Sequence, residues 1–234
     1  MSFYNDLLTQ MERSTAGSED TARKVMELCG RINARNALFF GDDLYTPALI
    51  AEKTGAELLA TFYEDFRAEK AAGLGMTSRV VGTFEIASRE GGWDFIWFNG
   101  GAEPDGVPRR LEQLREGLKK GKTAVYRTLC WLIDPSLDTK GYVERRFGRP
   151  VPLDRVVIMA KEQGFKVLDF YISPRSDWTE NYYRPMNALI RKLQQGDNAE
   201  GGSEDSTGIG EVNKETYMFD LHSEEYSYVY YILG

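Results

Sequence analysis

The 234-residue chain is long enough for one domain with a full hydrophobic core, and 42% hydrophobic and 28% charged residues are ordinary for a globular protein. Its formal net charge of -7 argues against a nucleic-acid partner or an acidic membrane partner, because both need a basic surface. The two cysteines lie in apolar runs and His222 is the only histidine, so we expect neither a metal site nor a histidine-based catalytic triad.

The N-terminal residues 1–6 lack the basic and apolar regions of a signal peptide. No run approaches the roughly 20 apolar residues of a membrane span. We therefore expect a cytoplasmic protein.

The first two thirds of the chain alternate between strand-like and helix-like patterns. Residues 1–17 show no strong period, and Ser18 with two following acids predicts a helix that ends at Gly30. Beyond it the apolar patterns predict a strand at 37–40, a helix from 46 to 54, a strand at 57–62, a helix at 64–72, strands at 79–81 and 94–98, a helix at 110–119 and a strand at 122–128. This alternation is typical of a parallel α/β sheet with helices on both faces.

The last third differs. The pattern predicts a helix at 153–163, a strand at 166–172, an aromatic-rich helix at 178–195 and a final strand at 226–232. Residues 196–210 are rich in glycine and polar residues, and we expect a mobile surface loop there. The two late strands should pair as an antiparallel edge, and residues 1–234 should form one domain.

Several segments are similar to class I S-adenosylmethionine-dependent methyltransferases, over roughly residues 17 to 234. Pro47–Glu57 resembles the helix and turn after the cofactor loop, and Trp93–Trp97 resembles the fourth strand. Leu111–Thr123 resembles the segment that leads from a helix into the fifth strand, and Gln163–Val167 resembles the residues before the sixth strand. Trp178–Pro185 resembles a segment of a bacterial subgroup acting on small molecules. The resemblance implies a Rossmann-like, seven-stranded, mostly parallel sheet with a late antiparallel pair, and S-adenosylmethionine as the cofactor.

The resemblance also locates the cofactor edge, where this sequence departs from the family. The family's first strand ends in an acid and a Gly-x-Gly-x-Gly loop. Here Phe39 stands at the acid, Gly41 is kept, and Asp43 and Tyr45 replace the other two glycines. The family's ribose-binding acid corresponds to Phe62. The implied cofactor residues are Gly41, Asp42, Asp43, Tyr45, Phe62, Tyr63, Glu64, Asn99 and Gly100.

Two interpretations of Asp42 and Asp43 remain open. They can be helix N-cap residues beside Thr46, because carboxylates accept hydrogen bonds from the free N–H groups of a first helical turn. Alternatively, Asp43 and Tyr45 occupy the former cofactor cleft, and either block it or recognise another ligand.

Further candidates follow from the resemblance. Residues 99–103 would line the reacting methyl group, so Glu103 faces the substrate, although a Gly-Gly turn explains the segment equally well. Trp131, Tyr182 and Tyr183 would cap a substrate pocket, although packing in the core or an interface explains Tyr182 and Tyr183 as well, and Trp178 is expected in the core. Tyr226, Tyr228 and Tyr230 share one face of the last strand, which suits a core or a homodimer contact.

Three hypotheses for function result. The chain is a small-molecule methyltransferase with an altered cofactor loop, or a non-catalytic protein of the same fold that binds a ligand or oligomerises. In the third, the cleft holds a different nucleotide, which the two aspartates disfavour because they would repel phosphate.

Overall fold

The computed structural model describes residues 3–81, 90–101, 106–196 and 203–234. Among these residues, eight strands form one sheet in the order β3-β2-β1-β4-β5-β8-β7, with the short β6 paired to β5. The strands are β1 (Asn36–Gly41), β2 (Glu57–Phe62), β3 (Ser78–Val80), β4 (Trp93–Asn99), β5 (Leu118–Trp131), β6 (Val151–Pro152), β7 (Val167–Ile172) and β8 (Tyr226–Leu233).

The sheet is parallel except for β8, which runs antiparallel to both of its neighbours. The two late strands therefore pair antiparallel as predicted, but β8 inserts between β5 and β7 and leaves β7 at the edge. All seven predicted strands are present. Within the described ranges the structure adds β6 alone, whose two residues are too few to show a pattern.

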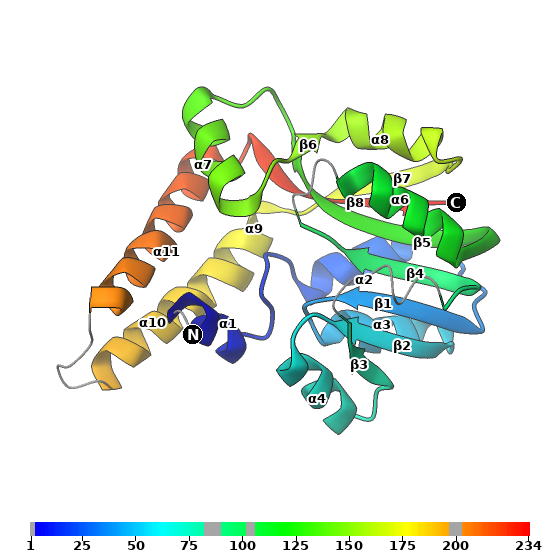
Figure 1. Cartoon of the computed structure of the whole chain (residues 1–234), viewed down its shortest axis with the longest axis horizontal. Coiled ribbons are helices and arrows are strands. Elements are labelled where there is room, and N and C mark those ends of the chain that lie inside the picture. The colour runs from blue at the N-terminus through cyan, green and yellow to red at the C-terminus, as the bar shows by residue number, and fades with distance from the viewer. Residues whose placement is uncertain (1–2, 82–89, 102–105, 197–202) are drawn as a thin grey trace.

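Helices cover both faces of the sheet and one end of it (Figure 1). They are α1 (Phe3–Gln10), α2 (Glu19–Leu28), α3 (Tyr45–Thr54), α4 (Asp65–Gly73), α6 (Gly106–Gly117), α7 (Leu137–Phe147), α8 (Leu153–Glu162), α9 (Arg175–Trp178), the π-helix η1 (Thr179–Tyr183), α10 (Arg184–Gly196) and α11 (Ser203–His222). Within the described residues, no helix is long and apolar enough to span a membrane.

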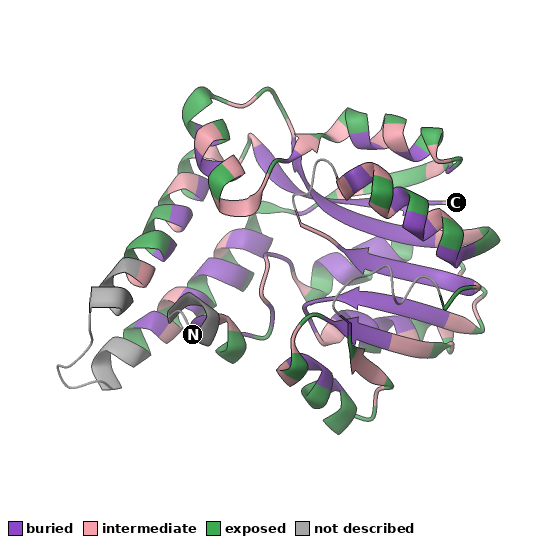
Figure 2. Ribbon diagram, viewed as in Figure 1, coloured by how far each residue is buried: buried purple, intermediate pink, exposed green. Residues whose placement is uncertain are grey.

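Alternating residues of the central strands supply the two main cores. Leu38 and Phe40 of β1 pack with α6 and α8, whereas Ala37 and Phe39 pack with α2, α3 and α4. These strands are buried along almost their whole length, and the helices turn their exposed sides outward (Figure 2). Burial on both faces explains why the strands read as continuous apolar runs.

A third core joins α1, α7, η1, α10 and α11 to the end of β5 and the start of β8. We call these helices, together with α9, the cap. Trp178 lies at its centre, stacked on Tyr228 and Phe219 with ring centroids 5.2 and 4.7 Å apart. Tyr226, Tyr228 and Tyr230 are all buried within the chain. A homodimer would therefore have to use another surface.

The prediction of a loop over residues 196–210 is wrong for the second half of that range. Residues 203–210 belong to α11, and residues 197–202 lie outside the described part of the chain. The helix packs against α1 and α7 with Val212, Glu215 and Phe219, which are buried at helical spacing. Glu215 interrupts the apolar stripe, and its charge is matched by Arg146 at 2.6 Å.

Candidate functional site

The candidate site lies at the carboxyl ends of β1 and β4, which are neighbours in the sheet. The chain leaves β1 toward α3 on one side and leaves β4 toward α6 on the other, so the strand order reverses here. Ligands of open parallel sheets bind at such a switch point. The structure brings Gly41, Asp42, Asp43, Asn99 and Gly100 together at this edge, as predicted.

Asp43 is fully buried and fastens the loop to β4. Its Oδ1 accepts a hydrogen bond from the backbone N–H of Thr46 at 2.7 Å, and its Oδ2 accepts one from Asn99 Nδ2 at 3.1 Å. Asn99 in turn accepts from Trp97 Nε1 at 2.8 Å. Burial raises the pKa of Asp43, an effect only partly offset by Arg13. The capping interpretation therefore fits Asp43 better, since its carboxylate accepts an N–H of the first turn of α3, although Leu44 stands at the N-cap position itself.

Asp42 does not cap the helix. Its Oδ2 accepts hydrogen bonds from the backbone N–H of Ser14 at 3.0 Å and from Thr15 Oγ1 at 2.7 Å. Burial alone would raise the pKa of Asp42, but the charges of Arg13 and Arg127 and the Thr15 bond outweigh burial and lower it. Residues 13–17, which we name the strap, thus lie across the candidate edge.

Two buried arginines hold the strap from the other side. Arg127 of β5 donates to Thr15 Oγ1 at 3.0 Å and to the carbonyl of Ala16 at 2.6 Å. Arg67 of α4 donates to Ser14 Oγ at 2.7 Å and to the carbonyl of Glu12 at 2.9 Å. The strap therefore joins β1, β5 and α4, three elements that are far apart in the sequence.

Arg13 and Tyr45 form the outer part of this arrangement. Arg13 donates to the Tyr45 hydroxyl, and its guanidinium lies 5.2 Å from the centre of the Tyr45 ring. Burial alone would lower the pKa of Arg13, but Tyr45, Asp43 and Asp42 raise it, so the guanidinium stays charged. Burial raises the pKa of Tyr45 well above its usual value, which keeps the hydroxyl protonated.

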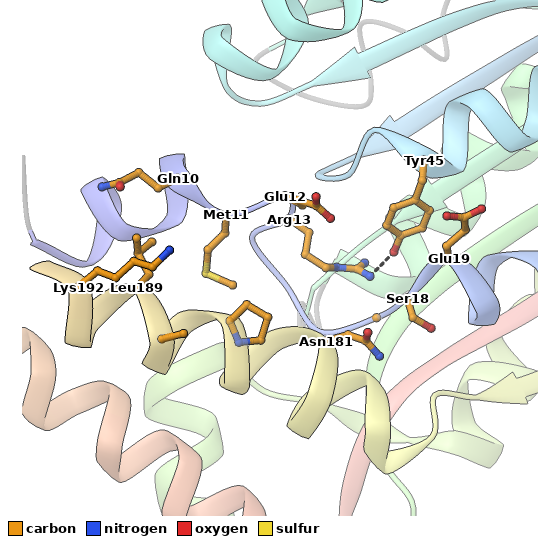
Figure 3. A pocket seen from close by; sticks show the side chains of 13 residues that line it. Gln10, Met11, Glu12, Arg13, Ser18, Glu19, Tyr45, Asn181, Leu189 and Lys192 are labelled. Carbon is orange, nitrogen blue, oxygen red and sulfur yellow. Dashed lines mark hydrogen bonds between the residues drawn. The ribbon is translucent and has the colours of Figure 1, made fainter.

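Tyr45 and Arg13 line a groove of about 600 Å³ between residues 10–19 and the η1–α10 segment (Figure 3). This volume is within the range of small-molecule sites. Tyr45, which replaces a glycine of the resembled loop, therefore faces this neighbouring groove.

The residues after β2 do not gather around a common point. Phe62 is fully buried and packs against Phe39, with ring centroids 5.9 Å apart. Tyr63 is exposed and touches Phe40 edge-on. Glu64 lies 3.4 Å from Ser14 Oγ and 3.5 Å from Arg67 Nε, and burial raises its pKa more than Arg67 lowers it.

The two glycines of the edge are required by packing within the chain. A Cβ on Gly41 would lie 2.5 Å from the Phe39 ring and 3.0 Å from Asn99 Nδ2. A Cβ on Gly100 would lie 2.8 Å from the backbone oxygen of Arg127. Such distances are too short for real Cβ contacts, so neither position accepts a larger residue without movement.

The predicted substrate residues that the structure describes lie in different surroundings. Glu103 lies outside the described residues. Trp131 and Tyr183 are buried in the cap core, where Trp131 contacts Tyr226 and Tyr183 contacts Trp178. Tyr182 alone borders the strap, at a small cavity of about 110 Å³ that Ser14 and Thr15 also line.

Sequence reasoning missed the arginines. Arg13 lies in a segment without periodicity, and Arg67 lies on a helix whose outward face is charged. Arg127 had a usable signal, because it stands inside the apolar run Ala124–Trp131, where a charge needs a buried partner. Among the described residues, no group of three or more His, Cys, Asp or Glu side chains could hold a metal ion.

Comparison with known proteins places these features in context. No protein-family model and no curated protein sequence matches the chain. The structure is similar to that of YjhP from E. coli, with 12% identity, a TM-score of 0.76 and 98% of each chain covered. It is equally similar to a SAM-dependent methyltransferase from Thiobacillus denitrificans in complex with S-adenosyl-L-homocysteine, with 12% identity, a TM-score of 0.76, and 99% of this chain and 97% of that chain covered. A SAM-dependent methyltransferase from Geobacter sulfurreducens, also in complex with S-adenosyl-L-homocysteine, gives 11% identity, a TM-score of 0.73, and coverage of 98% and 96%.

Proposed function

We propose that this chain, which has the fold of class I S-adenosylmethionine-dependent methyltransferases, is a non-catalytic protein of that fold that binds a small molecule. One observation carries the proposal. Asp42 and Asp43 stand in the loop that would meet the cofactor, and both carboxylates are buried and bonded to groups of this chain.

The residues at the edge do not fit S-adenosylmethionine. In the resembled family an acid after the second strand holds the ribose hydroxyls, and here the buried ring of Phe62 takes that place. A buried hydroxyl without a partner costs about 1–3 kcal/mol. The carboxylates of Asp42 and Asp43 are also already bonded to the strap, to Thr46 and to Asn99, so the loop is held by contacts within the chain. Both features support the proposed loss of cofactor binding.

Calorimetry and thermal unfolding test the proposal directly. A ligand that binds only the folded state stabilises that state by about 2.7 kcal/mol when the ligand concentration is a hundred times the dissociation constant. We expect no heat of binding and no rise in melting temperature with S-adenosylmethionine or S-adenosylhomocysteine at millimolar concentration. A saturable heat, or a melting temperature that rises with either ligand, would refute the proposal.

Methyl transfer from S-adenosylmethionine to a small molecule is the second candidate. It is favoured by the likeness, over nearly the whole chain, to two proteins whose structures hold S-adenosyl-L-homocysteine. Under this alternative, S-adenosylhomocysteine binds the wild-type protein. Under the first proposal it does not bind, because Asp42, Asp43 and the strap remain in place.

A further inference from the structure

The groove beside the candidate edge has the features of a binding site. It runs between residues 10–19 and α10, and Asp42 is not among the residues that line it (Figure 3). Its apolar lining comes from Met11, Pro185 and Leu189. Hydrogen-bonding and charged groups lie toward its two ends, with Arg13 and Tyr45 at one end and Lys192 at the other.

The inner end offers a hydrogen-bond donor that the described residues leave unused. The Tyr45 oxygen accepts from Arg13, so the hydroxyl proton is free to be donated, and no described acceptor takes it. A hydroxyl that accepts from a charged guanidinium is polarised, and it donates more strongly as a result. Arg13 beneath it is buried and charged. This end therefore favours an acceptor that carries negative charge.

The N-terminus of α2 adds to this preference. Ser18 and Glu19 line the groove, and Ser18 caps the ten-residue helix by accepting from Thr21 N at 3.1 Å. The N-terminal turn of α2 thus borders the same groove as Arg13 and Tyr45, and a helix N-terminus favours negative charge. Glu19 is neutralised by Arg23, whose Nε lies 3.0 Å from its carboxylate. Glu12 is exposed at the rim, so water screens its charge.

We propose that this groove binds a small organic acid, with its carboxylate on the Tyr45 hydroxyl beside Arg13 and its carbon chain along Met11, Pro185 and Leu189. A second acid group at the far end of the ligand reaches Lys192. The inference rests on the proposed small-molecule-binding function and names the ligand class and the site.

A matched set of probes tests the ligand class. Hexanoate, hexanedioate, hexanol and hexylamine share one chain length and differ only in their end groups. We expect hexanedioate to bind more tightly than hexanoate, and hexanol and hexylamine to leave the melting temperature and the calorimetric baseline unchanged. Binding of hexanol as tight as that of hexanoate would overturn the inference, and so would the absence of binding by both acids.

Paired variants test the site. Tyr45→Phe keeps the ring and removes the donor, so it should weaken the binding of both acids about tenfold, the usual effect of losing a hydrogen bond to a charged group. Tyr217→Phe removes an exposed hydroxyl on α11 and should change nothing. Lys192→Gln should weaken the binding of hexanedioate but not that of hexanoate. Lys161→Gln, on the exposed side of α8, should leave the binding of both acids unchanged.

The outcomes separate this inference from the function it rests on. Melting temperatures of the ligand-free variants correct for any stability lost when Arg13 loses its acceptor. If Tyr45→Phe and Tyr217→Phe bind the acids equally, the groove is not their site. If S-adenosylhomocysteine binds the wild-type protein, the proposed function fails, and that result leaves the acid series to be judged by its own variants.

Discussion

Asp42 and Asp43 are adjacent in the chain, yet the fold shifts the pKa of their carboxyl groups in opposite directions. Asp42 faces two arginines and a hydroxyl donor, which lower its pKa against the effect of burial. Asp43 is buried with its Arg13 partner 4.0 Å away, and burial raises its pKa. The difference predicts opposite pH dependences for the two positions.

Asp42→Asn should destabilise the fold by about 1–3 kcal/mol at neutral pH, because the charged hydrogen bonds to the strap are lost. Since folding lowers the pKa of Asp42, its stabilising effect is present above the unfolded pKa near 3.9 and disappears as the pH falls through the folded value. The loss in Asp42→Asn should therefore shrink toward acidic pH, as measured by urea unfolding. The exposed Asp134→Asn should show no such trend.

Asp43→Asn should show the opposite trend. Folding raises the pKa of Asp43, so the protonated form stabilises the fold at low pH and that contribution is lost as the pH rises through the folded value. Asparagine resembles the protonated acid. The free energy of unfolding of Asp43→Asn should therefore be highest, relative to that of the wild type, at neutral pH. A difference between the two proteins that does not change with pH would contradict this account.

The strap is the element on which the site depends most. Thr15 contributes a single hydroxyl that donates to Asp42 and accepts from Arg127, so one side chain connects β1 and β5. It belongs to a stretch without helix or strand periodicity, which is why the sequence did not indicate its role.

Thr15→Val should lower the free energy of unfolding by about 2–3 kcal/mol, because it removes one hydrogen bond from each of two buried charged groups at nearly constant volume. Thr15→Ser keeps the hydroxyl and should lose less than half as much. Chemical unfolding measures both variants. Equal losses would mean that the methyl group of Thr15 matters rather than its hydroxyl.

The strands and most helices were predictable, since periodicity and buried apolar runs report directly on packing. Ser18 caps α2 as expected, and Gly55 ends α3 with φ of 63°. No pattern predicted α1 or α7. The first has eight residues, too few to show a period, and the second buries Thr139 and Tyr142 in place of aliphatic residues. The helix at 203–210 was missed because glycine and polar residues dominate that stretch, whereas the buried residues of α11 lie farther along the chain.

At the scale of the whole molecule, Trp178 joins the cap to the sheet. It is 1% exposed and stacks on Tyr228 of β8 and Phe219 of α11. Its Nε1 donates to Ser227 Oγ at 3.1 Å. The prediction that Trp178 packs in the core is confirmed.

Trp178→Ala should destabilise the protein by about 3–5 kcal/mol, the usual effect of truncating a buried aromatic residue. Trp178→Phe fills more of the space and should lose clearly less. Hydrogen exchange in the wild type and in Trp178→Phe would show whether α10 and α11 open before the sheet. Faster exchange confined to the sheet would contradict a joining role for this tryptophan.

The overall fold was predictable from the order of weak local matches, and the comparisons with solved structures confirm it. The site was predictable only in part. Residues at strand ends converge because parallel topology places them at one edge, which located Asp42, Asp43 and Asn99. Arg13, Arg67 and Arg127 reach that edge from distant segments, and only tertiary packing brings them there.

Gly41 and Gly100 carry a consequence for how such sequences are compared. Each glycine is fixed by its own neighbours, the Phe39 ring for one and the Arg127 backbone for the other. Either residue would persist through selection for stability alone, long after a nucleotide had ceased to bind. A surviving motif glycine is therefore weak evidence of cofactor use, and side chains whose only purpose is the ligand are the better markers of lost or retained chemistry.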